Sequence, residues 1–200
     1  MFFENREEAL NRMISILDRN IDEDTILLAI SEQGVYYAKE IAKRFSLMDT
    51  DLLFSEILYA PNNRECSIGC ISETEDYVLI EELINSFSIS LDFIYSELKR
   101  LYEEKIISYI YKYRQGDSII SLKDRKVLLV DEGAVTGLTL EACIKSCISE
   151  GAKQLDVVMP VVPKSLGNQV KKLADNCYFV HEIENFVDID FYFKDRKEKI

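Results

Sequence analysis

The sequence predicts an α/β protein with a mostly parallel central sheet and helices on both of its faces. Two observations indicate this fold class. Apolar runs of strand length alternate with helical patterns through the second half of the chain, and Lys126–Asp131 is apolar between its charged ends, as in a strand buried on both faces. Because 48% of the 200 residues are hydrophobic, the chain can fill one core, and we expect a single domain over residues 1–200.

The N-terminal part predicts a helix, a strand, a second helix and another strand. Asn5 and Glu8 have the spacing of a capping box, and the apolar residues after them recur at helical intervals. Ile26–Ile30 is an apolar run of strand length, and after a short polar loop the pattern of Ala38–Phe45 is helical. Asp51–Leu58 predicts one further strand.

The middle of the chain predicts a strand pair and a long helix. Pro61–Asn63 breaks the chain, and Ser67–Ser72 and Tyr77–Ile80 then predict two strands. Over Ser90–Lys112 apolar residues recur at intervals of three and four, which predicts one long helix that ends at Arg114–Gly116.

Strands and helices alternate after Lys126–Asp131. The loop behind this strand leads into a helix at Leu140–Glu150, with Gly151 as its C-cap. Three further elements are expected, namely a strand at Leu155–Met159, a helix at Ser165–Ala174 and a strand at Cys177–His181.

Composition and charge exclude several classes of partner. The formal net charge of -12, with a pI near 4.7, repels polyanions, so we expect neither nucleic acid nor an anionic membrane as a partner. The chain shows no export signal and no run of bilayer length, which predicts a cytoplasmic protein. Its five cysteines are then expected to be reduced thiols, and the charged tail Lys194–Ile200 to be disordered.

The segment Val127–Thr139 carries the strongest functional pattern, because a strand, a glycine-containing loop and the start of a helix follow one another. Ligands of open α/β sheets bind beyond the carboxyl ends of the strands, where this loop is expected. Loop amides, the helix N-terminus and two threonine hydroxyls can converge on a phosphate, and two glycines let the backbone approach it closely. The residues expected to bind the ligand here are Gly133, Ala134, Val135, Thr136, Gly137 and Thr139.

Asp131 and Glu132 stand directly before this loop. Adjacent carboxylates are acceptors suited to the two vicinal hydroxyls of a sugar, so acids beside a phosphate site predict binding of a ribose 5-phosphate. A surface turn after a buried strand is the simpler interpretation, but the Thr-Gly-Leu-Thr continuation favours a binding site. The Lys of a Walker loop and the Gly-x-Gly-x-x-Gly turn are both missing, which argues against a nucleotide triphosphatase or a dinucleotide-binding protein.

The run Asp131-Glu-Gly-Ala-Val-Thr-Gly-Leu-Thr139 resembles the phosphoribosyl-diphosphate-binding motif of type I phosphoribosyltransferases. The resemblance implies the type I phosphoribosyltransferase fold, with a small hood and a helical insertion at about residues 85–115. It extends over most of the chain, to a group of predicted bacterial phosphoribosyltransferases, through Phe3–Leu10, Ala29–Ala42, Ala60–Asn62, Ser67–Gly69 and Tyr113–Arg114.

The resemblance also implies a role for each part of the site. Asp131 and Glu132 would act on the ribose and hold a Mg²⁺ ion, and the threonine loop would hold the 5-phosphate. The loop after the first core strand, with Ser31, Gln33 and Gly34, would hold pyrophosphate. The implied activity is transfer of a phosphoribosyl group from phosphoribosyl diphosphate to a nitrogen nucleophile, and no motif identifies the acceptor.

The pyrophosphate loop departs from the family pattern. Glu32, Gln33 and Gly34 stand where a basic residue and paired glycines are usual, and Glu56 lies where related proteins tend to place basic residues. Two like charges about 5 Å apart repel by roughly 3 kcal/mol at an effective dielectric of ~20, which weakens binding about a hundredfold. The alternative to an active transferase is therefore a catalytically impaired regulatory protein that binds a ribose phosphate or nucleotide. A third hypothesis is a scaffold that uses the helix at Ser90–Lys112 as an oligomer interface, most simply in a homodimer.

Other conspicuous residues have structural interpretations that we favour. Two cysteine pairs with four-residue spacing could bind metal, but small buried thiols explain them better. His181, the single histidine, stands at the end of a core strand, which favours a structural role. The aromatic residues between Phe93 and Tyr113 fit helix packing better than base stacking, and Arg114 is either a solvated charge or a phosphate contact.

Overall fold

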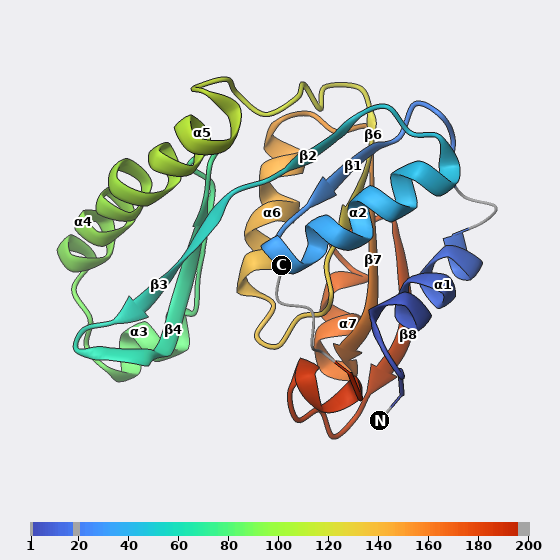
Figure 1. The fold of residues 1–200 in the computed structure, drawn as a ribbon. Helices are drawn as coiled ribbons and strands as arrows, with labels where there is room; N and C mark the ends of the chain where they lie inside the picture. The colour runs from blue at the N-terminus through green and yellow to red at the C-terminus, as the bar shows by residue number, and fades with distance from the viewer. Residues whose placement is uncertain (1, 18–20, 196–200) are drawn as a thin grey trace.

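The computed structural model describes residues 2–17 and 21–195 of the chain. Its centre is a five-stranded parallel sheet with the strand order β2-β1-β6-β7-β8, and helices cover both faces (Figure 1). The predicted fold class is therefore confirmed. The strands are β1 (Ile26–Ala29), β2 (Thr50–Leu52), β6 (Lys126–Val130), β7 (Gln154–Pro163) and β8 (Asn176–Ile183).

Two layers of helices enclose this sheet because its central strands are apolar on both sides. In β1, Leu27 packs in the core beneath one helical layer and Leu28 in the core beneath the other, and both are fully buried. One layer contains α1 (Arg6–Leu17) and α2 (Glu32–Phe45), and the other contains α6 (Leu138–Ser149) and α7 (Lys164–Val170).

Local signals in the sequence locate most ends of these elements. Half of the predicted capping box of α1 forms, since Asn5 Oδ1 accepts from the Glu8 amide at 2.9 Å. The Glu8 carboxylate accepts instead from the amide of Glu4, one residue before the cap, at 2.7 Å. Strand β7 runs further than predicted, because its parallel pairing with β8 continues to Pro163 opposite Ile183.

A small hood of three antiparallel strands stands beside the main sheet. The single strand predicted over Asp51–Leu58 is wrong, because the chain leaves one sheet for the other within it. Leu53 still donates its amide to Ala29 of β1, whereas Phe54 exchanges two hydrogen bonds of 2.9 Å with Glu73 of the hood. The hood strands are β3 (Ser55–Ala60), β4 (Asn63–Ser72) and β5 (Tyr77–Leu79).

A helical insertion follows the hood and packs against it. The sequence predicted one helix over Ser90–Lys112, and the structure contains α4 (Leu91–Leu101) and α5 (Ile107–Arg114) joined by a π-helical turn, Tyr102–Ile106. A short helix α3 (Glu81–Ser86) precedes them. Buried residues of the insertion and of the hood form one apolar cluster, which holds the two parts together.

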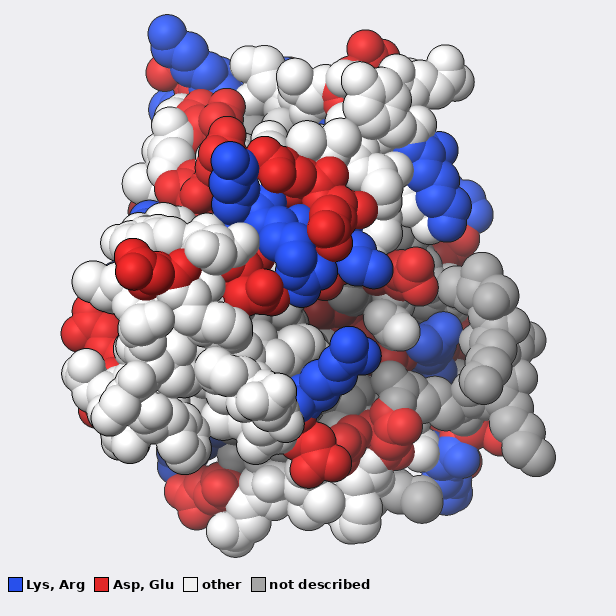
Figure 2. Space-filling view, turned by 90° about the vertical axis from the view of Figure 1, so that its left-hand side faces the viewer, with Lys and Arg blue, Asp and Glu red and all other residues white. Residues whose placement is uncertain are grey.

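The outer face of this insertion carries ion pairs between residues three or four positions apart. Arg100 pairs with Glu97 and with Glu104, and Lys99 with Glu103. Acids and bases consequently alternate over α4 and the π-helical turn, as Figure 2 shows for this side of the molecule.

Two expectations concern membranes and the chain end. No helix in the described ranges combines the length and the apolar character needed to cross a membrane. The disordered tail predicted for Lys194–Ile200 lies, after residue 195, outside the described residues.

Candidate functional site

The loop between β6 and α6 lies beside the loop between β1 and α2, because β1 and β6 are neighbours in the parallel sheet. The two loops and Ser55 of the hood enclose a cavity of about 310 Å³, which is within the usual size of small-molecule sites. The predicted site residues that line it are Ser31, Asp131, Gly133, Ala134, Val135, Thr136, Gly137 and Thr139.

The β6–α6 loop presents backbone amides that are available to an anion. Among the described residues, the amides of Val135, Thr136 and Gly137 donate no hydrogen bond to the protein. Gly137 is the N-cap of α6 and has a φ of 81°, a left-handed conformation, and a Cβ atom there would lie 2.4 Å from the Leu166 side chain. The loop therefore needs glycine at this position, and it places a helix N-terminus at the cavity.

Asp131 lines the cavity and has one carboxylate oxygen to offer. Its Oδ1 accepts hydrogen bonds from the Ser31 hydroxyl and, at 2.7 Å, from the Glu132 amide. Its Oδ2 has no hydrogen-bond partner among the described residues, so this oxygen is open to a sugar hydroxyl. Burial raises the pKa of Asp131 to about 7, although both hydrogen bonds favour the ionised form.

Glu132 is directed away from the cavity, contrary to the expectation that both acids face the ligand. Arg6 of α1 donates to its carboxylate from Nε at 2.7 Å and from NH2 at 3.4 Å, and the Tyr37 hydroxyl of α2 donates at 3.3 Å. The Glu132 side chain is 2% exposed and does not line the cavity. Successive side chains of an extended segment point to opposite sides, which is why only one of two adjacent acids reaches the ligand.

The pyrophosphate loop also differs from expectation. The Gly34 amide donates to Ser31 Oγ at 3.0 Å as an N-cap hydrogen bond of α2, so this amide is already engaged. Gly34 is needed for packing, because a Cβ atom there would lie 2.6 Å from the Val130 carbonyl oxygen. Gln33 is exposed in the first turn of α2, and neither Gln33 nor Gly34 lines the cavity.

One tyrosine of the insertion interacts with both acids that depart from the family pattern, although it does not line the cavity. Tyr109 of α5 donates from its hydroxyl to Glu56 of the hood at 2.5 Å. This hydrogen bond, with burial and the charges of Glu56 and Glu32, raises the pKa of Tyr109 to about 12. Both acids that depart from the family pattern therefore act on one phenol. Nothing in the spacing of the sequence could have revealed a contact between residues 53 positions apart.

The remaining candidates have structural partners. Arg114 pairs with Glu73 and with Asp51, packs over the Phe54 ring and does not line the cavity, so it is a largely buried ion pair and not a solvated charge. The His181 ring stacks on Phe2 with a centroid separation of 4.5 Å. Every cysteine is a free thiol, with Cys70, Cys143 and Cys147 buried and Cys66 and Cys177 partly exposed.

The donor set fits a magnesium ion only together with a substrate. In the described part of the chain, no three His, Cys, Asp or Glu side chains gather as a metal site. Mg²⁺ is commonly held by one or two carboxylates and completes its shell with water and substrate phosphate oxygens. Asp131 Oδ2 fits that arrangement, whereas the Glu132 carboxylate is engaged by Arg6.

Fold and site together define an α/β protein that places a helix N-terminus with unengaged amides beside a carboxylate under a hood. The chain matches the family model of the phosphoribosyl transferase domain over residues 3–195, and it belongs to that family. The resemblance inferred from the sequence is thereby confirmed.

Solved structures share the fold of this chain. The structure of TT1426 from Thermus thermophilus is 24% identical, covers 99% of this chain and 93% of its own, and gives a TM-score of 0.77. A purine phosphoribosyltransferase from Pyrococcus horikoshii is 14% identical, covers 100% of this chain and 96% of its own, and gives a TM-score of 0.53. Both likenesses concern the fold alone.

Two curated Mycobacterium tuberculosis sequences, each named as a phosphoribosyl transferase by prediction, are 25% identical over 176 residues. The match covers 86% of this chain and 39% of theirs, so this chain spans about two fifths of the length of these relatives.

Proposed function

We propose that the cavity binds phosphoribosyl diphosphate or a nucleotide containing ribose 5-phosphate, and that the chain transfers the phosphoribosyl group to a nitrogen nucleophile. One observation carries the proposal: the unengaged amides of Val135, Thr136 and Gly137 share a cavity with the open oxygen of Asp131. Membership of the phosphoribosyl transferase domain family supports the class of reaction.

In this proposal each part of the cavity binds one part of the ligand. The 5-phosphate lies at the start of α6, against the loop amides and the hydroxyls of Thr136 and Thr139. Asp131 accepts hydrogen bonds from the ribose, and Glu132 acts as a positioning residue whose pairing with Arg6 holds the backbone that carries Asp131. A Mg²⁺ ion held by Asp131 and substrate oxygens would supply positive charge for the departing pyrophosphate.

A catalytically impaired binding or regulatory protein is the second candidate, and the acidic residues near the proposed pyrophosphate loop favour it. Glu32 is exposed in the first turn of α2, Glu56 lies on the hood, and no Lys or Arg is among the described residues that line the cavity. Such a site would retain ribose 5-phosphate or a nucleoside monophosphate and bind the diphosphate weakly, because preorganised cations normally stabilise the leaving group.

Calorimetric titration in the presence of Mg²⁺ tests whether a ribose phosphate binds. We expect ribose 5-phosphate to bind the unmodified chain, and Asp131→Asn to weaken it roughly tenfold to a hundredfold, since a hydrogen bond to a charged group contributes about 1.5–3 kcal/mol. Inorganic phosphate lacks the sugar, so its affinity should change little. If neither ribose 5-phosphate nor phosphoribosyl diphosphate bound at about millimolar concentration, the proposal would fail.

A charge reversal at residue 32 distinguishes the two candidates. Glu32→Arg should strengthen binding of phosphoribosyl diphosphate more than binding of ribose 5-phosphate, because only the former places a diphosphate near α2. Glu23→Arg is the matched control, since Glu23 is also exposed and the net charge changes equally. Equal gains for both ligands, or equal gains in both variants, would contradict the placement of pyrophosphate beside α2.

A further inference from the structure

A second cavity, of about 440 Å³, lies at the opposite end of α6 from the candidate site. The phosphate loop precedes Leu138, and this cavity is lined by Glu150, directly after the last residue of the helix. At 1.5 Å per residue, a helix of 12 residues separates the two by about 18 Å. The cavity is therefore distinct from the proposed phosphoribosyl site.

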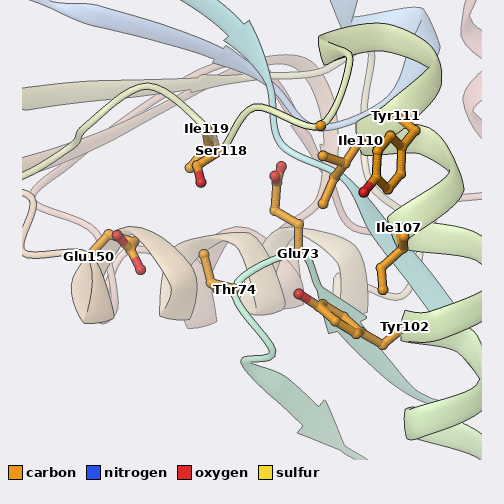
Figure 3. Close-up of a pocket in the computed structure, with 10 residues that line it drawn as sticks. Glu73, Thr74, Tyr102, Ile107, Ile110, Tyr111, Ser118, Ile119 and Glu150 are labelled. Carbon is orange, nitrogen blue, oxygen red and sulfur yellow. The ribbon is translucent and has the colours of Figure 1, made fainter.

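Four segments that are distant in the sequence contribute its walls. Figure 3 shows Glu73 and Thr74 from the β4–β5 turn, Tyr102 and Tyr111 from the helical insertion, and Glu150 at the end of α6. Apolar side chains of α5 and residues within 116–119, including Ser118, from the segment between α5 and β6 complete the lining. A volume of about 440 Å³ with mixed polar and apolar walls is typical of a small-molecule site.

The charge of the lining has one sign. Glu73 and Glu150 line the cavity, and no Lys or Arg is among the lining residues that the structure describes. Arg114 lies behind Glu73, but it also pairs with Asp51, so two carboxylates already offset its single charge. Burial and the charges of Glu75 and Glu73 raise the pKa of Tyr102, which indicates a negative potential at this phenol.

The π-helical turn of the insertion is adjacent to the same cavity. Its first residue, Tyr102, lines the cavity, and so does Ile107, the residue that follows the turn. Turns of this kind are rare within α-helices and occur frequently at functional sites, because they change the direction of a side chain without ending the helix. The irregularity therefore coincides with the aromatic wall of the cavity.

We propose that this second cavity binds a small organic cation, an ammonium or guanidinium group carried on an apolar body. The charged head lies toward Glu150 and Glu73, and the body packs against the rings of Tyr102 and Tyr111 and the apolar wall of α5. Aromatic faces attract organic cations, and nearby carboxylates add the attraction of opposite charges. A phosphate or carboxylate ligand is excluded by the same acids.

Two probes of matched shape and opposite charge test the proposal on the full chain. Phenethylammonium and 3-phenylpropionate carry the same ring on chains of similar length, and heteronuclear NMR would follow both titrations. Phenethylammonium should bind saturably and shift the amides of residues 116–119 and Glu150, whereas 3-phenylpropionate should not. Equal shifts with both probes, or no saturation with the cation at about 10 mM, would overturn the proposal.

A conservative variant then identifies the contact. Glu150 is exposed, so Glu150→Gln should fold normally and weaken phenethylammonium binding about fivefold or more, the effect of one charge a few ångströms away near a protein surface. Glu23→Gln removes an exposed charge elsewhere and should leave the affinity unchanged. Equal losses in the two variants would show that the cation responds only to net charge and would contradict a built site.

Discussion

Replacement of Arg6 tests whether Glu132 has a structural role or contacts the ligand. Arg6 approaches the Glu132 carboxylate at 2.7 Å and 3.4 Å, and the Glu132 side chain is only 2% exposed. Arg6→Met keeps most of the apolar stem but removes the guanidinium that faces this buried charge. We expect the free energy of unfolding to fall by about 3–5 kcal/mol, as when one partner of a buried ion pair is removed. Urea denaturation followed by circular dichroism measures the change.

The double variant Arg6→Met/Glu132→Gln provides the decisive comparison. With both charges removed, at least about half of the lost stability should return, and ribose 5-phosphate affinity should stay within about threefold. Arg12→Met is the control on the same helix, because Arg12 forms an exposed pair with Glu8 that should contribute less than about 1 kcal/mol. A tenfold loss of ribose 5-phosphate affinity in a folded double variant would show that Glu132 contacts the sugar, and would refute the structural role.

Three further predictions follow from single positions. Gly34→Ala brings a Cβ atom to 2.6 Å from the Val130 carbonyl oxygen. Although Ala has the better helix propensity, this close contact should lower the free energy of unfolding by about 1–2 kcal/mol, measured by urea denaturation. A more stable variant would contradict the close packing at Gly34. Burial and the Arg12 charge lower the pKa of His181 below 6.5, so the unfolded state binds the proton more strongly than the folded state. The protein should therefore lose stability as the pH decreases below about 6.5. The loss of stability at low pH should be smaller in His181→Asn. If the urea midpoints of the variant and the unmodified chain depended on pH in the same way, this role of His181 would be contradicted. If the predicted homodimer uses the insertion, Tyr95→Glu, at a side chain 53% exposed, should yield monomers in analytical ultracentrifugation, and unchanged association would exclude this face.

Elements with a complete local signal could be predicted from the sequence. The cap pair Asn5 and Glu8 marks the start of α1, and the uniformly apolar run before Asp131 marks β6 as a central strand. The division between β2 and β3 could not be predicted in this way, because it depends on hydrogen bonds between Phe54 and Glu73. Tertiary pairing overrides strand propensity there.

The same distinction between local signals and tertiary contacts applies to the candidate site. The shape of the β6–α6 loop was predictable because its amides and Gly137 belong to one short segment whose geometry is local. The partners of Glu132 and of Glu56 in the hood were not predictable, because Arg6 reaches Glu132 across 126 positions and Tyr109 reaches Glu56 across 53. A motif thus indicates which backbone is shaped for an anion, but the direction of a carboxylate depends on what packs against it.

Charge at the first turn of α2 separates the two candidate functions. Glu32 and Glu56 both contribute to the raised pKa of Tyr109, so two acids flank one phenol at this side of the site. The pKa of Lys112 is raised mainly by its hydrogen bond to Tyr113 and to a smaller extent by Glu32, but this ammonium is fully exposed and solvent screens its charge. A diphosphate carries more negative charge than a 5-phosphate and would therefore meet stronger repulsion in the proposed position beside α2. If the start of α6 holds the 5-phosphate as proposed, residue 32 is the position where a change of charge would alter the choice between the two ligands.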